Sequence, residues 1–262
     1  MTQFSDGISV GKAGTIQGSG TIRNVPQNLQ NNGTTASPVW VNASGPGGIN
    51  EGVPNGVLAQ LAITPTTSFT NNLASNQTIA AGGTFTLTAG TGVVSATVNG
   101  TPVLDLDCVR NIQFTGTSTA TTSSLATVVG YDQYGAKLTQ TLATPVGTAT
   151  TSTKKAFGYI STITCASTTT AGVSVGVGSA FGLPFAASDF GYVIPSWNQI
   201  QATTSAGFTP ADTTSPATAL TGDVRGTYVP QTTAPNGAQN LIIGHFVQSQ
   251  DSVDLAYGVQ QA

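Results

Sequence analysis

Few residues of this chain have the type and spacing that catalysis needs. The one histidine, His245, lies within the apolar run LIIGHFV, which has the composition of a strand. A Ser-His-Asp triad is a spatial arrangement that any chain order can build. The G-x-S-x-G turn that presents a nucleophilic serine is absent from the sequence. We therefore interpret His245 as a structural residue of its strand.

The carboxylates offer one close pair. Asp105 and Asp107 stand on the same face of a predicted strand, so their Cα atoms would be roughly 6.6–7 Å apart. Such a pair could act as the acid and base of a glycosidase or as part of a Ca²⁺ site. Calcium takes roughly six to eight oxygen ligands, and no D-x-D-x-D-G loop is present. We predict instead a solvated strand face or a contact to an arginine of a neighbouring molecule.

Other charged and glycine-rich stretches give weaker signals. Asp223 and Arg225 share a predicted strand face and could pair with each other or across an interface. Lys154 and Lys155 are the one adjacent basic pair, which we predict to lie in a solvated turn. The glycines of residues 11–20 have a spacing like that of phosphate loops but lack the strand–turn–helix context and the lysine. We therefore predict no catalytic, cofactor-binding or metal-binding residues.

The two cysteines are too few for a disulfide framework or a CxxC metal site. Cys108 alternates in phase with apolar strand residues such as Leu104 and Phe114, and Cys165 does so in its own strand. We predict two buried, free and unreactive thiols. Arg110 shares the face of Cys108, so it either lies at a rim or is paired when buried, and it could lower the pKa of that thiol.

Charge is scarce throughout the chain. Only 6% of the 262 residues are charged, the net charge is −3 and 39% are hydrophobic. Soluble domains usually have about 25% charged residues, so this surface must be covered mainly by uncharged polar side chains. An acidic pI near 4.7 argues against a nucleic-acid partner. No apolar run reaches the roughly 18–20 residues of a spanning helix, which argues against a membrane partner.

The stretch from Thr84 to Gly178 predicts a sheet built hairpin by hairpin. Short runs rich in Val, Ile, Thr and aromatic residues are separated there by turn residues. Asn99-Gly100 accepts the positive φ angles of a type I′ hairpin turn, and Asp132–Gly135 forms a second turn. Two more strands are expected at 223–229 and 240–247. The predicted fold is all-β, an antiparallel β-sandwich or jelly roll with extended N-terminal and C-terminal arms.

The domain boundaries follow from where this pattern starts. Residues 1–62 lack periodicity, contain many chain-breaking residues and carry scattered apolar residues, so we predict an extended N-terminal arm. VLAQLAI (57–63) is the one candidate for a short helical turn. Residues 63–262 form the predicted β-sandwich domain, and its last stretch, SQDSVDLAYGVQQA, is expected to dock as a further strand or a terminal arm.

Residues 181–222 form a connector within that domain. This stretch is rich in aromatic residues and proline, and Pro184 and Pro195 argue against a regular central strand. We expect an extended, packed segment there.

Four phrases follow one another along residues 84–247: GYDQYGAKLTQTL, KKAFGYISTITC, GVSVGVGSAFGLPF, and LTGDVRGTYVP with PNGAQNLIIGHFV. Together they resemble a group of virion structural proteins of tailed bacteriophages, while the first 60 residues lie outside the likeness. The resemblance implies a non-enzymatic component of the capsid surface, such as a head decoration (cement) protein. Its implied partners are the major capsid protein and copies of itself. It brings no functional residues with it.

This expectation places the protein in a virion assembled in the host cytoplasm, which agrees with an N-terminal sequence unlike a secretory signal. We expect a homo-oligomer, and a trimer would suit the threefold positions of an icosahedral shell. One alternative is a phage fibre, spike or tail component. Another is a carbohydrate-binding adhesin with exposed aromatics between Phe181 and Trp197, and a third is a hydrolase that uses Asp105 and Asp107.

Overall fold

The computed structural model describes residues 57–212, 214 and 222–247, together with four short strands nearer the N-terminus. Within these residues the fold is all-β and its strands pair in antiparallel fashion, so the predicted fold class is confirmed. The one helical element of the described residues is a 3₁₀ turn, η4 (Phe190–Tyr192). Most of the predicted arm at 1–62, and all of the segment after 247, lie outside the described residues. The four short strands are β1 (Ser9–Val10), β2 (Ile16–Gln17), β3 (Leu29–Asn31) and β4 (Trp40–Asn42).

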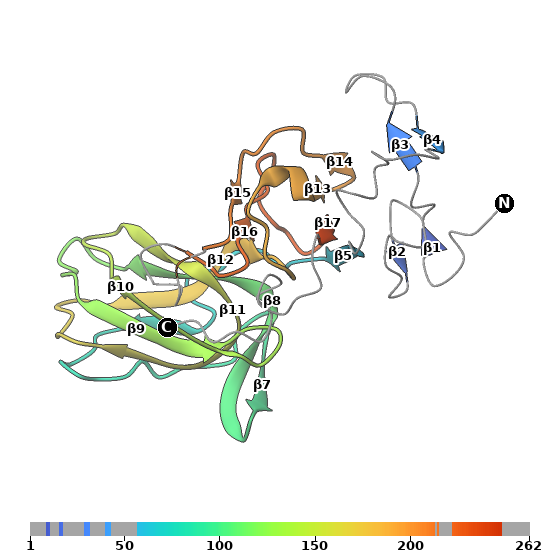
Figure 1. The fold of residues 1–262 in the computed structure, drawn as a ribbon. Coiled ribbons are helices and arrows are strands. Elements are labelled where there is room, and N and C mark those ends of the chain that lie inside the picture. Colours follow the sequence, from blue (N-terminus) through green and yellow to red (C-terminus); the bar gives the residue numbers. More distant parts are fainter. Residues whose placement is uncertain are drawn as a thin grey trace.

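The larger sheet has nine strands and curls into a sandwich-like half-barrel (Figure 1). Its strand order is β10-β9-β11-β8-β12-β16-β15, with β6 added beside β12 and β7 beside β8. Only three of its eight neighbouring pairs are consecutive strands (β9–β10, β7–β8 and β15–β16), so the prediction of a sheet built hairpin by hairpin is only partly right, and the central pairs β8–β11 and β8–β12 join strands that are distant in the chain. The strands are β6 (Ala74–Gln77), β7 (Val93–Val98), β8 (Thr101–Gly116), β9 (Leu125–Tyr131), β10 (Lys137–Ala143), β11 (Thr150–Cys165), β12 (Val173–Gly182), β15 (Phe208–Thr209) and β16 (Thr227–Tyr228).

Both predicted hairpin turns are confirmed. Asn99 has a φ of 49° and Gly100 a φ of 79°, the left-handed pair that a type I′ turn requires between β7 and β8. Between β9 and β10, Oδ1 of Asp132 accepts the backbone N–H groups of Tyr134 and Ala136 at 2.8 and 2.9 Å. This carboxylate therefore shapes the turn in the manner of an Asx motif.

The ladder between the long strands β8 and β11 is interrupted by register shifts. Tyr159 pairs with Asp105 while Phe157 pairs with Arg110, so the residues of β8 between those two partners bulge out of the ladder. The bulge resets the alternation of faces, and Cys108 packs against a different core from Leu104 and Phe114. The predicted common face is therefore wrong at Cys108. β11 begins at Thr150, so Lys154 and Lys155 lie in a strand and not in the predicted turn.

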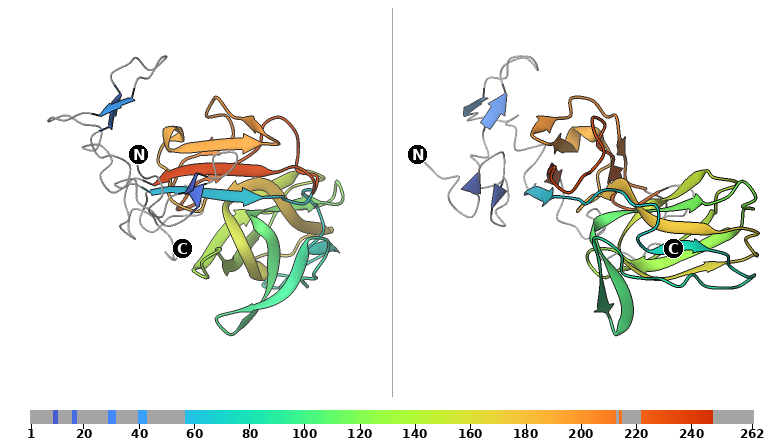
Figure 2. Two further views of the ribbon diagram at one scale, coloured as in Figure 1. Left: turned by 90° about the vertical axis from the view of Figure 1, so that its right-hand side faces the viewer. Right: turned by 180° about the vertical axis from the view of Figure 1, so that it is seen from behind.

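A second sheet of four strands runs in the order β14-β13-β17-β5 (Figure 2, left; β13 orange, β17 red, β5 cyan). It consists of β14 (Ile200–Gln201), β13 (Val193–Trp197), β17 (Leu241–Val247) and β5 (Val57–Ile63). The helical turn considered at 57–63 is wrong, because these residues pair with β17 along their whole length. The strand also runs through the predicted boundary between residues 62 and 63.

Pro195 lies inside β13, so the expectation of a connector without a regular central strand is wrong for residues 193–197. The sheet tolerates this proline because of its direction. Its carbonyl accepts the N–H of Ala202 at 2.8 Å, on the β14 side. Since the nitrogen and carbonyl of a strand residue point to the same side, the missing donor also faces β14. The ladder to β17 therefore loses no hydrogen bond at this position.

Two hydrophobic cores hold the fold together. The first fills the curled sheet and includes the fully buried Ile112, Phe114 and Phe157. The second lies under the four-stranded sheet and is built around Phe181, Trp197 and other residues: Leu183, Ala187, Val193, Tyr228, Leu241 and Ile243. Among the described residues, no helix is long and apolar enough to cross a membrane.

Candidate functional site

His245 faces the second core from β17 and is only 1% exposed. Its ring meets that of Phe185 edge to face, with 5.8 Å between the ring centroids. Burial lowers the pKa of His245 to about 4, and a hydrogen bond with the backbone of Ala186 offsets this only in part. The imidazole is therefore neutral at pH 7, enclosed by apolar groups, and its Nδ1 has no hydrogen-bond partner.

The bulge in β8 gives Asp105 and Asp107 different environments. Asp107 accepts hydrogen bonds from the backbone N–H and the hydroxyl of Thr66 at 2.7 and 2.8 Å, and its second partner is Arg110. Asp105 stands on the far side of the bulge, where partial burial raises the pKa of its carboxyl. No group of three or more potential metal ligands occurs among the described residues.

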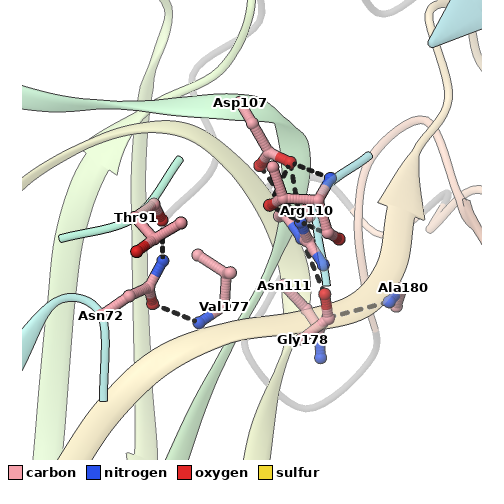
Figure 3. A network of polar contacts seen from close by, with 9 residues as sticks. Asn72, Thr91, Asp107, Arg110, Asn111, Val177, Gly178 and Ala180 are labelled. Carbon is pink, nitrogen blue, oxygen red and sulfur yellow. Dashed lines mark hydrogen bonds and ion pairs between the residues drawn. The ribbon is translucent and has the colours of Figure 1, made fainter. Parts of the chain in front are cut away.

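Arg110 is paired and buried, the second of the two predicted possibilities (Figure 3). Its Nη1 lies 2.9 Å from Oδ2 of Asp107, and its Nε donates to the carbonyl of Gly178 at 2.7 Å. The guanidinium also lies over the ring of Phe181, 5.3 Å from the centroid. Arg110 therefore links the bulge of β8 to β12.

Buried amides continue this network along β12 (Figure 3). Asn72 accepts the N–H of Val177 at 3.2 Å and donates to the carbonyl of Thr91 at 3.0 Å. Asn111 accepts the N–H of Ala180 at 2.9 Å. Asn111 satisfies a backbone group where the ladder between β8 and β12 is interrupted, and Asn72 satisfies one on the opposite side of β12, so their role is structural.

A second buried network joins the β9–β10 turn to the loop before β16. Nη2 of Arg225 lies 2.5 Å from Oδ2 of Asp132, and both side chains are buried. The carboxylate of Asp223 accepts the N–H groups of Ala156 at 3.0 Å and Arg225 at 2.9 Å. The sequence suggested Asp223 as the partner of Arg225, but it gave no sign of this ion pair with Asp132. The two residues are 93 positions apart, and only the folded sheet brings them together.

Lys155 corrects the prediction of a solvated turn. It lies in β11, is fully buried and donates from Nζ to the carbonyl of Thr139 at 2.9 Å, whereas Lys154 is exposed. Burial lowers the pKa of Lys155 to about 8, against the opposing effect of Asp223 and Asp212. A lysine with a lowered pKa can be a nucleophile, but this one has no exposed surface that a substrate could reach.

Both cysteines are free, and they differ in exposure. Cys165 is buried as predicted, whereas Cys108 is only partly buried, so its predicted burial is wrong. Burial raises the pKa of Cys108 to about 12; Asp107 adds to this effect and Arg110 opposes it. The predicted lowering of the Cys108 pKa by Arg110 is therefore smaller than the raising by burial and Asp107.

We expect the native protein to react slowly with thiol reagents at pH 8. With a pKa near 12, on the order of one in ten thousand Cys108 side chains is a thiolate at that pH. Asp107→Asn should accelerate the labelling of Cys108 and leave Cys165 unchanged, because it removes the nearby negative charge. Mass spectrometry of labelled native and denatured protein, with Cys108→Ser and Cys165→Ser to assign the signals, measures both rates. Rapid labelling of native Cys108 would contradict the raised pKa.

The surface, rather than a catalytic group, is the most unusual feature of the described body. Residues 57–247 include five basic and six acidic side chains. Five of these eleven charged side chains are buried: Arg110, Asp132, Lys155, Asp223 and Arg225. The surface is thus covered almost entirely by uncharged groups.

The four-stranded sheet is the extreme case. Its strands β14, β13, β17 and β5 contain no Lys, Arg, Asp or Glu. We call its outward side the uncharged face, made up of Gln60, Ala62, Ile194, Ser196, Ile242 and Gly244. Ile194 is 51% exposed, and Ile200 at the β14 edge is 62% exposed.

Sequence reasoning missed this face because β5 and β13 were not expected to be strands of one sheet. The available signal was the lack of charge in both stretches. Three side chains with possible reactivity, His245, Lys155 and Cys165, are buried beneath the surface of the described residues. No protein-family model, no curated protein and no solved structure matches this chain.

Proposed function

We propose that the protein is a non-enzymatic structural component of a bacteriophage virion, a decoration (cement) protein that stabilises the head shell. The observation that carries the proposal is the burial of five charged side chains beneath a nearly uncharged surface. Such a surface has little charge to repel a neighbour and little charge to desolvate when it is covered. A protein that works packed against other subunits benefits from both properties.

The proposed partners are the major capsid protein and other copies of this chain, on the outer surface of the capsid. The order of phrases between residues 84 and 247 resembles virion structural proteins, which supports this choice of particle. A fibre, spike or tail component is the second candidate within the same structural class.

The adhesin alternative receives less support. A carbohydrate platform needs aromatic side chains that stay exposed. Phe181 is fully buried and Trp197 is 3% exposed. Phe185, Phe190 and Tyr192 are partly buried.

The test uses the purified chain and phage heads that lack it. The protein is expected to co-sediment with heads up to a saturating ratio and to raise the temperature at which they break open. Deleting residues 1–55, which leaves β5 intact, is expected to keep the β-sheet signal in circular dichroism but to reduce attachment. Protein that stays in the supernatant contradicts the decoration role, and immunogold labelling of tails alone supports the second candidate. Unfolding of the truncated chain would contradict the predicted arm.

A further inference from the structure

Strand β5 is an open edge without the usual protection. It ends the order β14-β13-β17-β5, and its seven residues pair with β17 in one unbroken register. Natural edge strands are commonly blunted by lysine, proline or a bulge, but VLAQLAI contains none of these. The hairpin β1–β2 approaches β5, yet no described strand pairs with this edge.

The direction of the backbone groups on this edge follows from Pro195. Because the carbonyl of Pro195 faces β14, its partner Ile243 directs its own N–H and C=O toward β5, where it bonds Leu61. Alternate residues point the other way. Leu58, Gln60 and Ala62 therefore present their main-chain donors and acceptors to the open edge.

The sequence of β5 complements itself in antiparallel pairing. With Gln60 opposite the Gln60 of a second copy, the register places Ala59 opposite Leu61 and Leu58 opposite Ala62, so the sequence pairs a larger residue with a smaller one at each position. The outermost positions, Val57 and Ile63, bring two β-branched residues together. In this register the edge-facing residues of both copies fall opposite one another, as a hydrogen-bonded ladder requires.

Gln60 supplies an independent sign of a missing partner. The side chain of Gln60 is only partly exposed. Its Oε1 is shielded from solvent and accepts no hydrogen bond. A buried acceptor without a donor is costly and calls for explanation. In the paired edge the two Gln60 side chains lie side by side on the uncharged face, where each Oε1 can accept from the Nε2 of the other.

We propose that two copies of this chain associate through β5 across a twofold axis, which joins their four-stranded sheets into one continuous sheet. The contact is isologous, because each copy offers the same strand. It extends the uncharged face across both copies. This inference rests on the self-association contained in the proposed function, and it names the strand and the register that carry it. Any trimer uses other surfaces.

Disulfide formation between engineered cysteines tests the proposed register of the paired β5 strands. Hydrogen-bonded opposite residues have Cα atoms about 5.5 Å apart, within the range of about 4.4–6.8 Å that a disulfide spans. Gln60→Cys is expected to give a covalent dimer under mild oxidation. The matched control is Gln201→Cys, an exposed position on the opposite edge strand of the same sheet, which should stay monomeric on a denaturing gel. The unmodified chain controls for its two native thiols.

A charge test reads the energetics. Gln60→Lys places two ammonium groups opposite each other and should weaken the dimer up to about fivefold in Kd, measured by sedimentation over a concentration series. High salt should partly restore the association, because it screens the repulsion. Gln201→Lys should leave the Kd unchanged, and circular dichroism confirms that each variant is folded.

Three outcomes would overturn the inference, and they can be told apart. If the unmodified chain stays monomeric at all concentrations, both the β5 contact and the proposed self-association are wrong. If the chain self-associates but Gln60→Cys gives no covalent dimer and Gln60→Lys has no effect on the Kd, only the β5 contact is wrong. A Gln60→Cys dimer that forms only after deletion of residues 1–55 assigns the edge to the chain's own N-terminal segment.

Discussion

Asp132→Ala is expected to lower the free energy of unfolding by about 3–5 kcal/mol, the usual loss when one partner of a buried ion pair is removed. The substitution removes the carboxylate that lies against the buried guanidinium of Arg225. It also removes the acceptor for the N–H groups of Tyr134 and Ala136, which shape the β9–β10 turn. Urea unfolding followed by circular dichroism measures the change.

The matched control is Asp189→Ala. Asp189 also accepts a backbone N–H in a short turn, that of Gly191 at 2.7 Å, but it is exposed. Its loss should cost about 1 kcal/mol or less. Replacing Asp132 and Arg225 together by Leu and Met should cost less than Asp132→Ala alone, because both charges of the buried pair are then removed. Similar losses for Asp132→Ala and Asp189→Ala would show that the buried ion pair is not the source of stability.

Lowering the pH from 6.5 to 4 is expected to cost about 3 kcal/mol of stability through His245 alone. The pKa of this residue falls from 6.5 in the unfolded chain to about 4 in the folded one. Between these values the unfolded state binds a proton and the folded state does not, so stability decreases as the pH falls. Below about pH 4 both states are protonated and this contribution levels off.

The measurement is the urea midpoint at half-unit steps of pH, compared with His245→Gln. The variant cannot titrate in this range, so its profile should be flatter between pH 6.5 and 4. The slope that remains in the variant reports the carboxylates. Parallel profiles for the two proteins would mean that the pKa of His245 is not lowered in the folded state.

Local signals made the hairpins predictable. Asn99-Gly100 and Asp132–Gly135 each determine a turn within a few residues, and the strands beside them alternate in polarity. The strand β9 (Leu125–Tyr131) runs directly into the Asp132–Gly135 turn. In these cases the residues that set the structure lie next to the residues that adopt it.

Long-range partners explain what the sequence did not show. VLAQLAI has no local feature that marks it as a strand, because the strand that pairs with it begins at Leu241. The sequence indicates a solvated pair at Lys154 and Lys155. In the folded chain Lys155 is buried beside Asp223 and Thr139, which lie far from it in the sequence. Cys108 changes core because β8 bulges against β11, and a bulge that depends on a partner strand leaves no mark on simple alternation.

The pairing of β5 with β17 also sets the order in which the chain can fold. The hydrogen bond from Thr64 to Asn240, beside this pairing, spans 176 residues, whereas the hairpins β7–β8 and β9–β10 close within a few residues. During synthesis β5 leaves the ribosome long before β17 is made. Its apolar residues therefore have no partner strand while the curled sheet assembles. Contacts of such high sequence separation form slowly, because a large loop must close first. We therefore expect the four-stranded sheet to form after the β7–β8 and β9–β10 hairpins, and the apolar residues of β5 to be open to misassembly until then.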